Sequence, residues 1–156
     1  MAAEPEMIVD PAVARRKFER DVRPLVEHPD AFARIGIRPL VVAFPTVRVA
    51  LHWPSREIDL GLELSAPDWD YRPPTVDWVK LDGAPWAAGE APSGDGFQEP
   101  NPNTRRPDRP WFCFRGSLEF HEYAGHSAEA WWPIHADERY RILGFIQNVA
   151  AVLARK

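Results

Sequence analysis

The chain has 156 residues, 45% of them hydrophobic and 27% charged, which is ordinary for one folded domain and excludes a wholly disordered chain. The formal net charge of −4 argues against a dedicated nucleic-acid-binding protein, because such proteins carry a basic surface. The single cysteine excludes an intramolecular disulfide and favours a reducing compartment. Without a signal peptide or a long apolar stretch, we expect one cytoplasmic domain over residues 1–156, with no membrane and no nucleic-acid partner.

The first half of the chain predicts a helix followed by an antiparallel meander. Residues 1–9 are expected to be a flexible N-terminus. A helix begins after Asp10, a capping residue followed by Pro11, and ends or kinks at Pro24. Segments that are rich in β-branched residues or that alternate apolar with polar residues then predict four strands: 40–44, 47–51, 57–64 and 75–81.

The second half predicts a long loop, a hairpin and a second helix. Residues 82–110 are rich in proline and read as a loop within the domain, a candidate lid or partner surface. After Asp137, apolar residues recur at helical spacing: Ile142, Phe145, Ile146, Val149 and Leu153. The fold class is therefore α+β, in the order N-terminal helix, meander, long loop, hairpin, C-terminal helix.

The hairpin is expected at 111–121, where aromatic and polar residues alternate. A three-residue turn at 115–117 pairs the aromatic residues with one another. The same register sets Cys113 opposite Glu119, with Cα atoms about 5 Å apart. His121 then lies two residues along on the same face.

These residues, with His126 brought close by a turn at Gly125, predict one metal site. The predicted ligands are Cys113, Glu119, His121 and His126. A thiolate, a carboxylate and two imidazoles suit zinc first and iron second. Four ligands fit a closed structural site, whereas a site in which Glu119 only supports another ligand keeps an open catalytic position.

Simpler interpretations of the same residues stay open. Cys113 between two phenylalanines could be a small core residue, since free cysteine is commonly buried. Glu119 and His121 could form a surface pair across the strands, and His126 could be a turn residue.

The segment from Cys113 through Glu119 and His121 to His126 resembles the predicted metal-binding family named for cysteine, glutamate and two histidines (CEHH). That family occurs beside bacterial genes for ubiquitin-like proteins, their activating and conjugating enzymes and JAB-type peptidases. The resemblance implies a metal-binding accessory protein whose partner is the modifier, the activating enzyme or the peptidase. The motif covers about a tenth of the chain.

A second resemblance covers more of the chain. The order of elements is similar to the ubiquitin-conjugating enzyme fold (UBC- or RWD-like). Segment 70–76 looks like that family's Tyr-Pro-x-x-Pro-Pro turn, 101–103 like its His-Pro-Asn segment, and 132–133 like its Trp-x-Pro; Cys113 occupies the cysteine position. Asn101 replaces the histidine, and about ten extra residues separate Cys113 from the tryptophan.

Three functional hypotheses follow. The first is the metal-binding accessory protein of a ubiquitin-like modification system. The second is an active conjugating enzyme that forms a thioester at Cys113, with Asn103 stabilising the oxyanion. The third is a metal-dependent hydrolase with Glu119 as general base. The first two compete for Cys113, because a metal-bound thiolate is a poor carrier of a thioester.

Overall fold

The structure is a computed structural model, which describes residues 9–87, 89–98 and 111–156. The predicted flexible N-terminus therefore lies outside the described residues, except for Val9. The same is true of residues 99–110 of the predicted loop, including Asn101 and Asn103.

The N-terminal helix α1 spans Pro11–Glu27, and the Asp10 carboxylate caps it by accepting a hydrogen bond from the backbone N–H of Ala12 at 2.9 Å. The helix does not end at Pro24 but continues for one more turn. Pro24 costs the helix a backbone hydrogen bond, but burial of Leu25 just beyond it favours continuing. A short helix that the sequence did not predict, α2, follows at Pro29–Arg34.

Four antiparallel strands in chain order form the sheet, as the β-rich and alternating segments predicted. They are β1 (Arg38–Ala43), β2 (Thr46–Trp53), β3 (Ile58–Ser65) and β4 (Thr75–Val79). On one face Val49 lies opposite Leu62, and both are buried. On the other face Arg48 lies opposite Glu63, and their side chains form an ion pair at 2.8 Å. One face thus belongs to the core and the other carries polar pairs across the strands.

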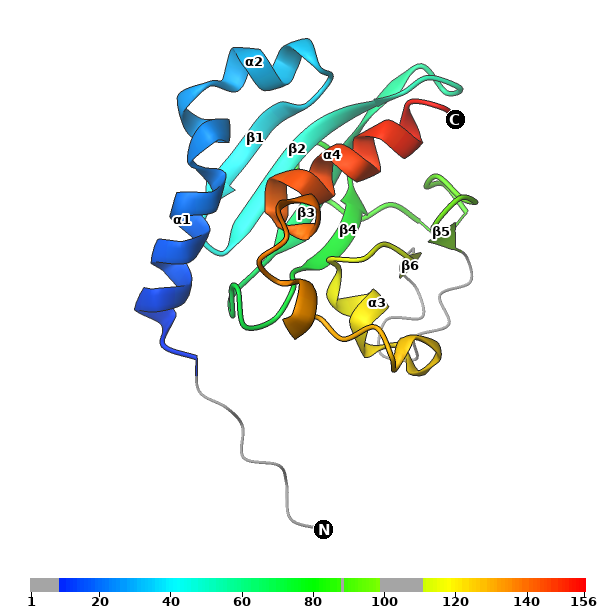
Figure 1. Ribbon diagram of the computed structural model, residues 1–156. Helices are drawn as coiled ribbons and strands as arrows, with labels where there is room; N and C mark the ends of the chain where they lie inside the picture. Colours follow the sequence, from blue (N-terminus) through cyan, green and yellow to red (C-terminus); the bar gives the residue numbers. More distant parts are fainter. Residues whose placement is uncertain (1–8, 88, 99–110) are drawn as a thin grey trace.

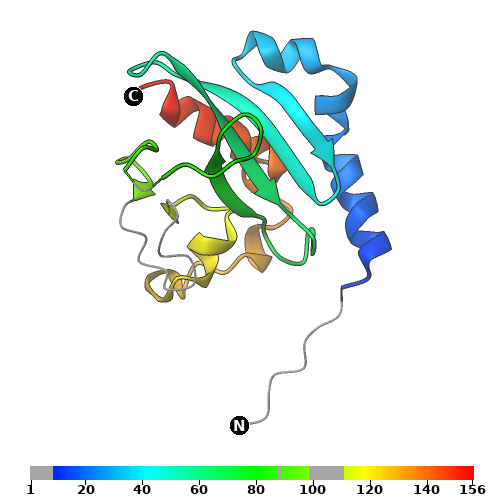
Figure 2. The same ribbon diagram turned by 180° about the vertical axis from the view of Figure 1, so that it is seen from behind.

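The C-terminal helix α4 (Ile142–Leu153) lies across one face of this sheet (Figure 1), and the view from behind shows the opposite face without a helix over it (Figure 2). All five apolar residues of the predicted helical pattern are buried in the core: Ile142, Phe145, Ile146, Val149 and Leu153. The α+β class and the two terminal helices are therefore confirmed. Among the described residues, no helix combines the length and apolar character needed to cross a membrane.

The part of the predicted loop that the structure describes contains one short strand, β5 (Phe97–Gln98). It pairs antiparallel with β6 (Trp111–Phe112). Phe97 and Phe112 pack edge to face, with ring centroids 5.6 Å apart, and both also contact Trp78 of β4. This aromatic packing attaches the β5–β6 pair to the sheet and places the residues after Phe112 beside it.

An ion-pair cluster around the buried Arg141 and Asp70 holds the two long helices together. Arg141, at the start of α4, bonds Asp21 of α1 and, at 3.1 Å, Asp70 of the loop between β3 and β4. Lys17 also reaches Asp70, at 2.8 Å, and the Trp69 indole donates to Asp21 at 2.7 Å. The two carboxylates and the guanidinium are thus paired with one another inside the protein, which is the condition for burying charge at low cost.

Candidate functional site

Cys113 lies directly after β6, and its backbone N–H donates to the carbonyl of Gly96 at 2.7 Å. The predicted hairpin beyond it is wrong, because Leu118–Glu122 forms a short helix, α3. Ser117 begins this helix: its hydroxyl accepts from the backbone N–H of Phe120 at 3.3 Å and donates to the carbonyl of Phe112 at 3.0 Å. A capping serine therefore outweighs the alternating pattern at this point.

The helix turns Glu119 away from the position predicted for it opposite Cys113. Its side chain is 4% exposed, and one carboxylate oxygen accepts a hydrogen bond from the backbone N–H of Val76 on β4 at 3.4 Å. Glu119 therefore faces the sheet and joins α3 to β4.

His121 is held between two backbone groups. Its Nε2 accepts from the N–H of Gly116 at 3.0 Å, and its Nδ1–H donates to the carbonyl of Glu129 at 2.6 Å. Burial lowers the pKa of His121, so its imidazole stays neutral at pH 7. Both ring nitrogens are used by the protein itself.

The predicted proximity of Cys113 and His126 is present. The Cys113 sulfur lies 3.7 Å from Nε2 of His126, within hydrogen-bond distance for sulfur. The Nδ1–H on the other side of the ring donates to the Glu129 carboxylate at 2.5 Å, and the ring stacks on Phe120 with centroids 3.9 Å apart. Thiol, imidazole and carboxylate thus form a continuous row.

Burial and the charge of Glu129 together set the electrostatics of this row. Hydrogen bonds from Arg115, at 2.7 Å, and from His126 lower the pKa of the Glu129 carboxyl. Burial raises the pKa of the Cys113 thiol, and the resulting negative charge on Glu129 raises it further. Cys113 therefore rests as a thiol at neutral pH and needs a proton acceptor to become nucleophilic, and His126 is within reach to be that acceptor.

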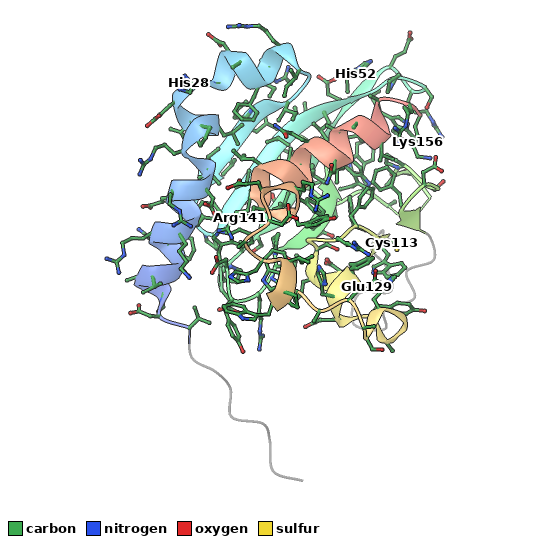
Figure 3. The ribbon with its side chains drawn as sticks, viewed as in Figure 1. His28, His52, Cys113, Glu129, Arg141 and Lys156 are labelled. Carbon is green, nitrogen blue, oxygen red and sulfur yellow. The ribbon has the colours of Figure 1, made fainter. Side chains whose placement is uncertain are left out.

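The row opens into a groove of about 580 Å³ between this segment and α4. Cys113, Phe114 and Phe120 line one side, and Asn148 and Val152 of α4 line the other. In Figure 3, Cys113 and Glu129 lie on the same side of the molecule, far from His28, which lies between α1 and α2, and from His52 on β2. A reacting group in the groove can therefore reach the thiol from solvent.

Among the described residues, no three side chains of His, Cys, Asp or Glu are gathered closely enough to hold a metal ion. Cys113 and His126 by themselves fit two of the four ligand positions around one zinc ion. Their sulfur and nitrogen are 3.7 Å apart, and sulfur and nitrogen ligands of one tetrahedral zinc lie about 3.5 Å apart. His121 and Glu119 are bonded to Gly116 and Val76 instead. The four-residue metal site stays a prediction, of which the geometry supports two ligands.

No protein-family model and no curated protein sequence matches this chain. The resemblances to the CEHH family and to the conjugating enzymes therefore stay predictions that rest on the residues quoted for them.

Two residues of the site were missed by the sequence interpretation: Glu129, which orients His126, and Arg115, which binds Glu129. The signal for Glu129 is its position three residues after His126, a spacing at which side chains meet within one turn. Arg115 has no comparable signal, because it lies 14 residues from Glu129 along the chain.

Proposed function

We propose that this protein is a conjugating-type component of a bacterial ubiquitin-like modification system, in which Cys113 accepts the modifier as a thioester. The observation that carries the proposal is the row of Cys113, His126 and Glu129 at the edge of an open groove. The N-terminal helix, the four-stranded meander and the position of the cysteine after it agree with the resemblance to conjugating enzymes. We propose a cytoplasmic location, where a reducing environment keeps Cys113 as a free thiol.

In the proposed reaction the modifier arrives as a thioester on a cysteine of an activating enzyme. The Cys113 thiol gives its proton to Nε2 of His126 while its sulfur attacks the thioester carbonyl carbon. Glu129 stabilises the imidazolium through Nδ1–H and keeps the ring oriented. The bond from that carbon to the activating enzyme's sulfur then breaks, and the leaving thiolate takes the proton from His126. One thioester replaces another, with no oxidation or reduction.

The test is incubation of the chain with ATP and the ubiquitin-like protein and activating enzyme of the same genome. On a non-reducing gel we expect an adduct of chain and modifier that a thiol reductant removes. Cys113→Ser should give an adduct that resists the reductant, because an oxygen ester replaces the thioester, and Cys113→Ala should give none. A wild-type adduct that survives reduction, or one that Cys113→Ala still forms, would sink the proposal.

A second candidate function, the metal-binding accessory protein, is favoured by one observation. The Glu129 carboxylate binds Nδ1 of His126 while Nε2 faces the Cys113 sulfur, which is the support that zinc-binding histidines commonly receive. Cys113 and His126 would hold the ion, zinc first and iron second, and the bound ion would supply structural cross-linking or Lewis acidity.

Elemental analysis of the purified protein tests the second candidate. About one zinc or iron per chain, lost in both Cys113→Ala and His126→Ala, is the result that supports it. A metal-free wild type overturns it. His28→Ala, which changes a histidine far from the site, is the matched control and should leave the metal content unchanged.

A further inference from the structure

His121 links two segments that surround Cys113. The N–H of Gly116, in the turn after Cys113, donates to its Nε2 at 3.0 Å, and its own Nδ1–H donates to the carbonyl of Glu129 at 2.6 Å. The imidazole therefore fixes the distance between the turn that follows the thiol and the segment that carries Glu129.

These two bonds require one form of the ring. A ring that donates through Nδ1 and accepts through Nε2 is neutral, with its proton on Nδ1. In this form the nitrogen that would bind a metal ion is used by Gly116. His121 thus holds the segment together, although its residue type and place in the sequence suggest a ligand.

Glu129 is in turn held at two points. His121 binds its backbone carbonyl, and Arg115 binds Oε1 of its carboxylate at 2.7 Å. The remaining oxygen, Oε2, accepts Nδ1–H of His126 at 2.5 Å. Because the backbone and one oxygen of Glu129 are fixed, the direction of the other oxygen is fixed as well, and it sets the orientation of His126 toward Cys113.

We infer that His121 is a positioning residue, which holds Glu129 so that the carboxylate keeps His126 directed at the Cys113 sulfur. The inference rests on the proposed function only for its catalytic consequence. The role of His121 in holding Glu129 and His126 does not depend on that function, and it can be measured without a modifier or an activating enzyme.

The direct measurement is the tautomer of each imidazole, from proton–nitrogen spectra of the labelled full chain at a pH where the rings are neutral. In the wild type, His121 and His126 should both carry the proton on Nδ1. In His121→Ala, His126 should lose this single form and become a mixture of the two tautomers. His135→Ala is the control: it removes a ring whose Nδ1–H donates to the Trp132 carbonyl at 2.5 Å, and it should leave His126 unchanged.

A conservative pair keeps the test decisive if His121→Ala does not fold. His121→Asn places an amide donor where Nδ1–H stood and should preserve the His126 signal, whereas His121→Gln places its amide where Nε2 stood and should not. A wild-type His121 protonated on Nε2, or a His126 tautomer that is unchanged in both His121→Ala and His121→Gln, overturns the inference.

The effect of His121 on the rate of thioester formation can be measured separately from its effect on the His126 ring. At saturating activating enzyme, the rate of thioester formation should fall about tenfold in His121→Gln and recover in His121→Asn, because misplacing a catalytic group slows the chemical step. If no thioester forms even in the wild type, the proposed function fails while the spectra still decide the role of His121. If thioester forms but the spectra do not change, the role of His121 fails alone.

Discussion

Two polar clusters in this protein use the same kinds of side chain in different surroundings. In the ion-pair cluster, the side chains of Arg141 and Asp70 are each 8% exposed, and both are bonded to other protein groups. In the site around Cys113, the side chains of Glu129 and Arg115 are 34% and 49% exposed. The groove leaves the thiol accessible from solvent.

The difference separates a cluster enclosed by the protein from one whose thiol lines an open groove. Arg141 reaches Asp21 and Asp70 on separate segments, so the energy of those bonds holds α1, the β3–β4 loop and α4 together. In the site, the same kind of pairing serves to orient one ring toward one sulfur. A cluster of charged side chains is therefore weak evidence for a functional site, whereas a potential nucleophile that solvent can reach is stronger evidence.

The largest expected effect comes from breaking the ion-pair cluster. Arg141→Met should lower the free energy of unfolding by about 3–5 kcal/mol, because it leaves the buried carboxylate of Asp70 and the partly buried one of Asp21 without their shared partner. Urea unfolding measures the loss. Arg139→Met, which removes an exposed pair with Asp137, is the control and should change stability little. Similar losses in the two variants would show that burial does not separate the two kinds of pair.

An intermediate effect is expected from Gly116, where the site meets the core. Its φ is +101°, and a Cβ there would lie 2.7 Å from the Tyr140 carbonyl oxygen. Gly116→Ala should cost about 1–3 kcal/mol and displace the N–H that bonds His121. Gly36→Ala, at a φ of +84° with open space around it, is the matched control and should cost less. Thermal unfolding compares them, and equal losses would remove the contact with Tyr140 as a cause.

The smallest effect on stability, but a specific one on reactivity, is expected from Glu129→Gln. Its negative charge opposes formation of the Cys113 thiolate, so removing that charge should lower the pKa of the thiol. The alkylation rate with iodoacetamide, measured across pH, should therefore shift toward lower pH, and the single cysteine makes the signal unambiguous. In the proposed reaction, thioester formation should fall at the same time, since the amide of glutamine carries no charge to stabilise the His126 imidazolium.

Glu138→Gln is the control for that experiment, because Glu138 lies in a separate short 3-10 helix, Glu138–Tyr140. An alkylation profile that moves toward higher pH in Glu129→Gln would contradict the electrostatic account of the site.

The sheet and the terminal helices could be predicted because their signals are periodic and locally consistent. Leu60, Leu62 and Leu64 alternate over the whole of β3, and the pattern that ends at Leu153 repeats through three turns of α4. Each pattern is long enough that no single residue can reverse it.

The site could be predicted only in part, because its segment is short and its signals conflict. Alternation from Trp111 onward favours strands, but Ser117 caps a helix whose five residues turn Glu119 toward β4. The prediction that Cys113 and His126 lie close together is correct although the hairpin is wrong, because the chain after α3 turns back toward the thiol. The roles of Arg115 and Glu129 depend on that return and have no pattern of their own in the sequence.

Helix α4 has two rows of residues, one buried in the core and one lining the groove. Val149 belongs to the row that is buried against the sheet, whereas Asn148 and Val152, one turn apart, face the groove beside Cys113. Substitutions in the groove row can change which molecules fit there while the buried row keeps the helix in place. The shape of the groove can therefore change while the fold stays the same.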